Sequence, residues 1–123
     1  MKITNQINNN DCGVSVLLSL FNHFYKKELD RSNLLNEIEF KDDGISLNEL
    51  ESVAYKYGIM MESYNANLDD IKKLKKHKIF VSILKNNDLL HYVICEKLNH
   101  HIIRIYCSIL GEYDVTIEHF ESL

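Results

Sequence analysis

The chain has 123 residues, of which 46 % are hydrophobic, and its formal net charge is −4. This length suits a single domain, residues 1–123, with one modest core. The mixed charge gives no reason to expect nucleic acid as a partner, and we interpret the lysines between positions 72 and 78 as a solvated helix face. The sequence contains neither a stretch of about 20 apolar residues nor the apolar run of a signal peptide. We therefore expect a cytoplasmic protein, in which three cysteines do not form a disulfide framework.

The first half of the sequence is typical of helices. After Cys12, apolar residues recur in steps of three and four, which predicts a helix with one apolar face. They are Val14, Leu17, Leu18, Phe21, Phe24 and Tyr25. A short helix is predicted around Leu34, Leu35 and Ile38. Another is predicted from the capping-box pattern Ser46-Leu47-Asn48-Glu49 to Gly58, and a fourth after Asn67.

The second half is typical of strands. Residues 79–84, 91–96, 102–107 and 113–117 are rich in β-branched and aromatic residues, and residues 99–101 (Asn-His-His) suggest a hairpin turn. A last helical turn is predicted at residues 119–121. Helices followed by antiparallel strands indicate an α+β fold, in which N-terminal helices pack on a C-terminal antiparallel sheet.

Cys12 is the first candidate for chemistry. It precedes the first amphipathic helix, and the positive end of a helix favours the nucleophilic thiolate. Gly13 would let a substrate backbone approach closely. Gln6 lies six positions upstream, where its amide and the Cys12 backbone N–H could hold the oxyanion of a tetrahedral intermediate. Papain-like enzymes use this spacing. Taken alone, the position of Cys12 favours a purely structural role, and its spacing to Gln6 only suggests a catalytic pair.

Among the six histidines, His91 is the candidate base, because it is predicted to begin a strand beside a loop. If the hairpin turns about Asn99, position 107 lies directly opposite position 91 on the same sheet face. In a Cys-His site an Asp or Asn there would hold the imidazole Nδ1–H, and the residue present is Cys107. Because His100 and His101 lie near Cys95 and Cys107 without metal-site spacing, we predict no metal and no cofactor.

These motifs, taken in order, resemble the double-glycine leader peptidases, the N-terminal domains of peptidase-containing ABC transporters that process and export bacteriocins. The shared elements are Gln6, Asp11-Cys12-Gly13, Gly44-Ile45-Ser46-Leu47, His91-Tyr92-Val93-Ile94, Gly111 and His119-Phe120. The resemblance covers nearly the whole chain and implies a papain-like cysteine peptidase fold. It implies catalytic roles for Cys12 and His91 and an oxyanion role for Gln6.

Two positions depart from the family pattern. The family's Asp-Pro is Cys107-Ser108 here, and the Pro expected at about Lys78 is absent. A thiol accepts hydrogen bonds weakly, so the Asp role is not carried over to Cys107. Asp114 or a backbone carbonyl is left as a substitute for orienting His91. Activity weaker than that of a complete triad is therefore expected.

The resemblance implies a cysteine endopeptidase that removes leader peptides after a double-glycine-type site during peptide export. Its partners would be a precursor leader peptide and the membrane and ATPase domains of an ABC transporter, at the cytoplasmic face of the membrane. The alternatives are a cargo-docking domain with little or no catalysis, which the change at position 107 favours and the presence of Cys12 opposes, and a structural α+β domain without a site.

Overall fold

A computed structural model describes residues 1–4, 12–36, 46–63, 66–86 and 89–123. Its helices and strands alternate little along the chain, and most helices come first. In order they are α1 (Cys12–Tyr25), α2 (Arg31–Asn36), α3 (Leu47–Lys56), α4 (Leu68–Lys72), β1 (Ile79–Asn86), β2 (Leu89–Lys97), β3 (Ile102–Cys107), β4 (Gly111–Thr116) and α5 (Ile117–Glu121). The α+β order expected from the sequence is confirmed.

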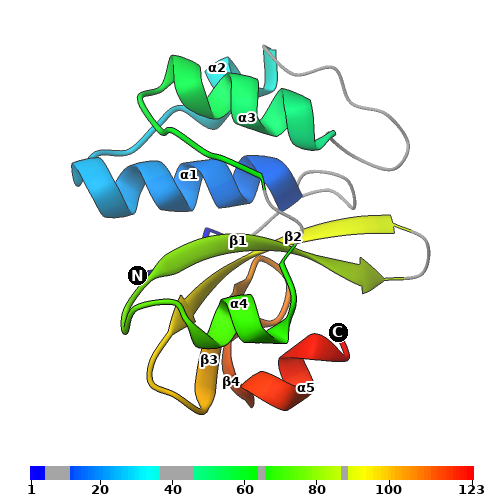
Figure 1. Cartoon of the computed structure of the whole chain (residues 1–123). Helices are drawn as coiled ribbons and strands as arrows, with labels where there is room; N and C mark the ends of the chain where they lie inside the picture. The colour runs from blue at the N-terminus through cyan, green and yellow to red at the C-terminus, as the bar shows by residue number, and fades with distance from the viewer. Residues whose placement is uncertain (5–11, 37–45, 64–65, 87–88) are drawn as a thin grey trace.

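The four strands form one antiparallel sheet in the order β1-β2-β3-β4 (Figure 1). Helices α1, α2 and α3 lie on one side of this sheet, and the short helices α4 and α5 lie on the other. Because side chains alternate along a strand, β2 and β3 contribute to a separate core on each side. Tyr92, Ile94 and Tyr106 pack with α1, whereas Val93, Cys95, Ile103, Ile105 and Cys107 pack with α5.

Helix α1 forms the centre of the first core. Its apolar stripe is buried against the sheet, with Val14 and Val16 fully buried and Leu17 2 % exposed. Phe24 and Tyr25, at the C-terminal end, remain largely exposed. Burial of the stripe, rather than the intrinsic propensity of its β-branched residues, stabilises this helix.

Capping interactions define both ends of α3 and the start of α4. The Ser46 side chain accepts a hydrogen bond from the Glu49 N–H at the start of α3. At its end, Gly58 has φ +82°, and the N–H groups of Gly58 and Ile59 bond back to Tyr55 and Ala54. This is the Schellman pattern, in which glycine is favoured because a side chain disfavours positive φ. In α4, Asn67 and Asp70 form a reciprocal capping box. Of the predicted second helix, Ile38 lies outside the described residues.

The hairpin between β2 and β3 does not turn about Asn99. The paired residues are Ile94 with Tyr106 and Lys97 with Ile103, so the turn is centred one residue later. Asn99 Oδ1 accepts hydrogen bonds from the N–H groups of His101 and Ile102, at 2.8 Å and 3.0 Å. These hydrogen bonds from the backbone to the Asn99 side chain stabilise a loop that is longer than the predicted one. Each residue of β3 consequently pairs two positions away from the predicted partner. Because side chains alternate with period two, the face of each residue is unchanged.

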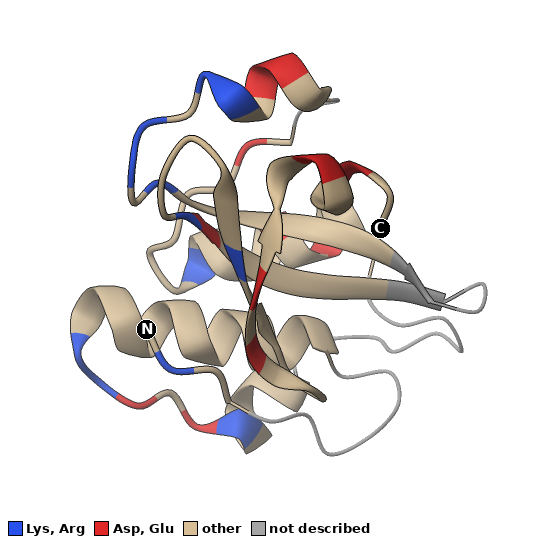
Figure 2. Cartoon of the chain, turned by 90° about the horizontal axis from the view of Figure 1, so that it is seen from below, with Lys and Arg blue, Asp and Glu red and all other residues tan. Residues whose placement is uncertain are grey.

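Charges of both signs are interspersed over the described surface (Figure 2). In α4, Asp69 and Asp70 occupy the first turn and Lys72 the last, the arrangement that complements the helix dipole. The other lysines of the basic cluster follow the helix and are exposed, so only Lys72 lies on it. In the described part of the chain, none of the helices has the length and apolar character required to cross a membrane.

Candidate active site

Cys12 was predicted to precede the first helix and is the first residue of α1, and its side chain is buried, with 3 % exposure. The backbone N–H of Tyr92 donates to Cys12 Sγ at 3.5 Å. The helix N-terminus and this N–H both direct positive partial charge at the sulfur. The fold therefore places partial positive charge on two sides of the Cys12 sulfur.

His91 lies at the same end of the sheet. It is the third residue of β2 rather than the first, because the strand begins at Leu89, and it pairs with Leu84 of β1. Its side chain is buried. Hydrogen bonds with Cys107 and then with Cys12 raise the pKa of His91 to about 9, although burial acts in the opposite direction. The imidazole thus connects two thiols that belong to the cores on opposite sides of the sheet.

Cys107 is the last residue of β3, and its Sγ lies 3.2 Å from His91 Nε2. The prediction that positions 91 and 107 share a sheet face is confirmed by this contact. The prediction that they are directly opposite is wrong, because the observed register, continued by one residue, places Cys107 opposite Val93. His91 and Cys107 are instead diagonal neighbours, which long side chains can bridge.

The ring nitrogen that faces position 107 also differs from the prediction. We expected Nδ1 to face the third residue, and the structure places Nε2 there. Because Nε2 is engaged with Cys107, Nδ1 is the ring nitrogen left for the hydrogen bond with Cys12. From these contacts we infer the order Cys12, Nδ1, Nε2, Cys107 along the site.

The tight turn between β3 and β4 provides hydrogen-bond donors for Cys107. The backbone N–H of Leu110 donates to Cys107 Sγ at 3.5 Å, and Gly111 closes the turn with φ +84°. Burial by itself raises the pKa of the Cys107 thiol, but hydrogen bonds from His91 and from the N–H groups of Leu110 and Ile109 outweigh it, so that the pKa is lowered. These amide donors were not predicted from the sequence, in which Gly111 was the available signal of the turn.

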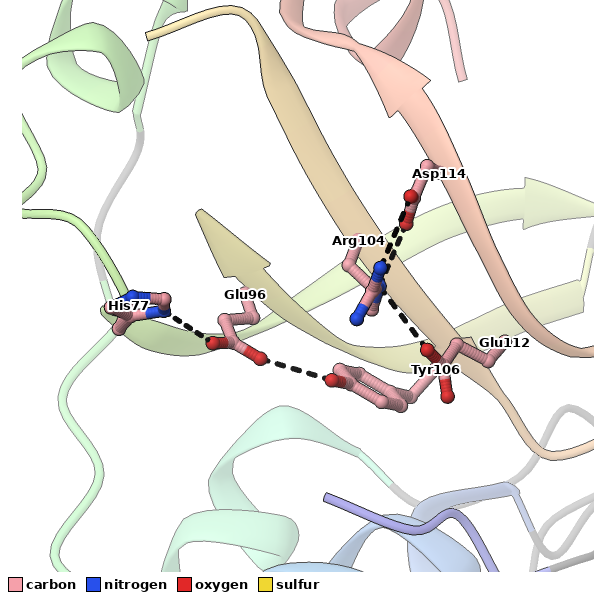
Figure 3. A network of polar contacts seen from close by, with 6 residues as sticks. All are labelled: His77, Glu96, Arg104, Tyr106, Glu112 and Asp114. Atoms are coloured by element: carbon pink, nitrogen blue, oxygen red, sulfur yellow. Dashed lines mark hydrogen bonds and ion pairs between the residues drawn. The ribbon is translucent and has the colours of Figure 1, made fainter. Parts of the chain in front are cut away.

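The other predicted site residues make no described contact with His91 or Cys107. Gln6 and Asp11 lie outside the described residues, as do Gly44 and Ile45. Gly13 is buried in the first turn of α1. Asp114 does not substitute for the missing Asp, because its carboxylate is engaged in an exposed pair with Arg104, at 2.8 Å (Figure 3).

Known proteins resemble this chain over its whole length. The Peptidase C39 family matches residues 1–123. A putative ABC transporter ATP-binding protein of Mycoplasma genitalium is 30 % identical over 123 residues, and its homologue in Mycoplasma pneumoniae is 29 % identical over 113 residues. These alignments cover 100 % and 92 % of this chain but only 18 % and 16 % of the relatives. The chain thus spans less than a fifth of the length of these two proteins.

Solved structures share the fold. The peptidase domain of Streptococcus ComA, a bifunctional ABC transporter involved in quorum sensing, superposes with a TM-score of 0.80 at 25 % identity, over 98 % of this chain and 90 % of that one. A double-glycine-motif protease from an AMS/PCAT transporter, solved with a leader peptide, has a TM-score of 0.79 at 18 % identity, over 98 % and 82 %. With this family match, these superpositions and the Cys12–His91 arrangement, the chain belongs to the peptidase C39 family and has its papain-like cysteine peptidase fold.

Proposed function

We propose that residues 1–123 form a cysteine endopeptidase domain that removes leader peptides after a double-glycine-type site during peptide export. The observation that carries this proposal is the joint placement of Cys12 at a helix N-terminus and of His91 in hydrogen-bond contact with it. A thiolate beside an imidazolium is the reactive form of a Cys-His nucleophile. The match to the ComA peptidase domain supports the same activity.

The reaction has two halves. In acylation, the Cys12 thiolate attacks the scissile carbonyl carbon, an S–C bond forms, and His91 gives the Nδ1 proton to the leaving amine as the C–N bond breaks. In deacylation, His91 takes a proton from water, the resulting hydroxide attacks the thioester, and Cys12 leaves as thiolate. The products are a leader with a free carboxylate and a peptide with a free amine. Gln6 and the Cys12 backbone N–H hold the oxyanion in both halves.

The substrate is a precursor peptide with an N-terminal leader. The AMS/PCAT neighbour was solved with such a leader, which supports this choice of partner. The relatives named as ABC transporter proteins are several times longer than this chain, so we place the domain beside the membrane and ATPase parts of an exporter, at the cytoplasmic face of the membrane. Only small residues fit beside a nucleophile as buried as Cys12.

A second function, docking of cargo without cleavage, is favoured by one observation. Position 107 carries Cys rather than the Asp of the family pattern. A docking domain would bind leaders as tightly as an active peptidase but would not cut them.

Cleavage of a synthetic precursor is the direct test. A peptide with a Gly-Gly junction is incubated with the wild type, Cys12→Ala and Cys95→Ala, and the products are identified by mass spectrometry. We expect cleavage after the second glycine by the wild type and by Cys95→Ala, since Cys95 lies in the core away from His91. Cys12→Ala should lower kcat/KM by about 10⁴-fold or more.

Two results would separate the alternatives. Binding of the leader by wild type and Cys12→Ala with no product from either would establish docking in place of peptidase activity. Cleavage that persists in Cys12→Ala would remove Cys12 from the mechanism.

A further inference from the structure

The sulfur of Cys107 has hydrogen-bond donors on two sides. His91 Nε2 lies 3.2 Å from its sulfur, and the Leu110 N–H reaches the sulfur from the turn at 3.5 Å. The side chain is 3 % exposed, so water competes little for these contacts. A neutral thiol is a weak acceptor, whereas a thiolate accepts such donors strongly. The geometry is therefore that of an anion site rather than of a packed apolar residue.

Cys95 provides an internal comparison. It belongs to the same core cluster as Cys107 and is also fully buried. Burial raises the pKa of the Cys95 thiol, and no described residue offsets this effect with a hydrogen bond. Burial also raises the pKa of the Cys107 thiol, but the hydrogen-bond donors around it lower this pKa by more, so the net direction is downward. Two thiols in one core thus differ because only one of them meets an imidazole and turn amides.

We propose that Cys107 is the positioning residue of this site: its thiolate accepts the His91 Nε2–H and holds the ring with Nδ1 toward Cys12, so that the domain works with a Cys-His-Cys triad. This rests on the proposed peptidase function, in which Cys107 does not touch the substrate and acts through His91. It replaces the expectation that position 107 cannot serve as an equivalent of Asp.

The proposal has a consequence for pH dependence. His91 must be protonated to donate to the leaving amine, so activity falls as the pH rises through about 9. The hydrogen bond with Cys107 is the largest influence that raises the pKa of His91. Its removal should therefore move the loss of activity at high pH toward the ordinary histidine value of 6.5. The other titratable groups described near this pair are Cys12 on α1, which acts on His91, and Tyr113 on β4, on which Cys107 acts; burial raises the pKa of Tyr113.

Three substitutions at one position separate charge from shape. Ser matches Cys in size but stays neutral, Asp is larger but carries the charge, and Ala removes the acceptor. We expect Cys107→Ser and Cys107→Ala to lower kcat by about 10²-fold or more, with little change in KM. Cys107→Asp should retain the wild-type rate to within about 10-fold. A structural role for Cys107 predicts the reverse order, with Ser better tolerated than Asp.

The ring titration of His91, followed by NMR of the imidazole, gives a readout that needs no substrate. The midpoint should lie near 9 in the wild type, and Cys95→Ala should leave it there. It should stay within about one pH unit of this value in Cys107→Asp and move clearly toward 6.5 in Cys107→Ala and Cys107→Ser. Should Cys107→Ala not fold, the Ser and Asp variants provide the same comparison.

Each outcome addresses one proposal. A His91 midpoint unchanged in Cys107→Ser, or cleavage by Cys107→Ser faster than by Cys107→Asp, would overturn the positioning role while leaving the peptidase intact. A midpoint that shifts as expected in a protein that cuts no double-glycine peptide would support the Cys107 contact and reject the proposed function.

Discussion

The two ends of β2 each bring a histidine together with an acidic group, in opposite surroundings. At one end the buried His91 contacts the thiols of Cys107 and Cys12. At the other, Glu96 meets His77 Nδ1 at 2.9 Å and the Tyr106 hydroxyl at 2.9 Å, and the His77 side chain is 65 % exposed (Figure 3). Similar contact distances therefore have different consequences, because water screens the second pair and is excluded from the first.

The surroundings of His91 explain how its hydrogen bonds raise its pKa. The raised pKa of His91 depends on hydrogen bonds made inside the protein, where competing water is scarce. At the Glu96 end, burial of the carboxyl raises its pKa. Hydrogen bonds from His77 and Tyr106 lower this pKa by a larger amount, so the net direction is downward. We expect the first end to control activity and the second to make a small contribution to stability.

The largest expected effect separates the two histidines. His91→Ala should lower kcat/KM for a double-glycine precursor by about 10⁴-fold, because it removes the proton donor and acceptor together. His77→Ala, the matched change at the other end of β2, should leave kcat/KM unchanged within about twofold. Steady-state cleavage measurements check both, and an equal loss in the two variants would contradict the distinction.

An intermediate effect is expected at Lys97, the last residue of β2. Its side chain is buried. Nζ donates to the backbone carbonyl of Lys72, the last residue of α4, and to that of Leu74, two residues later. Lys97→Met keeps the alkyl chain but leaves these acceptors unpaired, at a cost of about 1–3 kcal/mol in the free energy of unfolding. Denaturant unfolding measures it, with the exposed Lys78→Met as control, for which we expect less than about 0.5 kcal/mol. Equal stabilities of the two variants would show that the carbonyls find other donors.

The smallest effect is expected for Glu96→Gln. The substitution keeps size and one hydrogen bond, so the loss at neutral pH should be below about 1 kcal/mol. A lowered pKa contributes stability above the ordinary value of 4.5 that is lost as the pH falls through the folded-state value. The difference between wild type and variant in urea unfolding should therefore shrink below pH 4.5. A difference that grows in acid would reverse the assigned direction.

Local patterns were sufficient to predict most of the elements. The Ser46 cap, the stop at Gly58 and the helix after Asn67 occur as predicted, because each depends on residues within one or two helical turns. The apolar stripe after Cys12 packs in the core as far as Phe21, whereas Phe24 and Tyr25, which were predicted to belong to it, are exposed. The strand boundaries were less well defined: β2 begins at Leu89 rather than His91, and Ile117 belongs to α5 rather than to the last strand. Gly111 at the start of β4 accounts for its earlier beginning.

The pairing of Cys12 with His91, by contrast, joins residues that are far apart in the sequence. Local patterns made each residue a candidate, and the order of motifs in a known family supported their pairing. No local pattern indicated that the Tyr92 N–H would face Cys12 Sγ, because this contact depends on how α1 packs against β2.

The sequence by itself thus determined the order and the faces of the elements, because periodicity and capping act within short segments and face assignment survives a register shift of two residues. Only the tertiary structure decided how Cys107 approaches His91, which ring nitrogen faces Cys107 and whether Cys107 meets further donors. These depend on the Asn99 turn, on the turn that ends at Gly111 and on the approach of α1 to β2, and small changes in each of them move side chains by several ångströms.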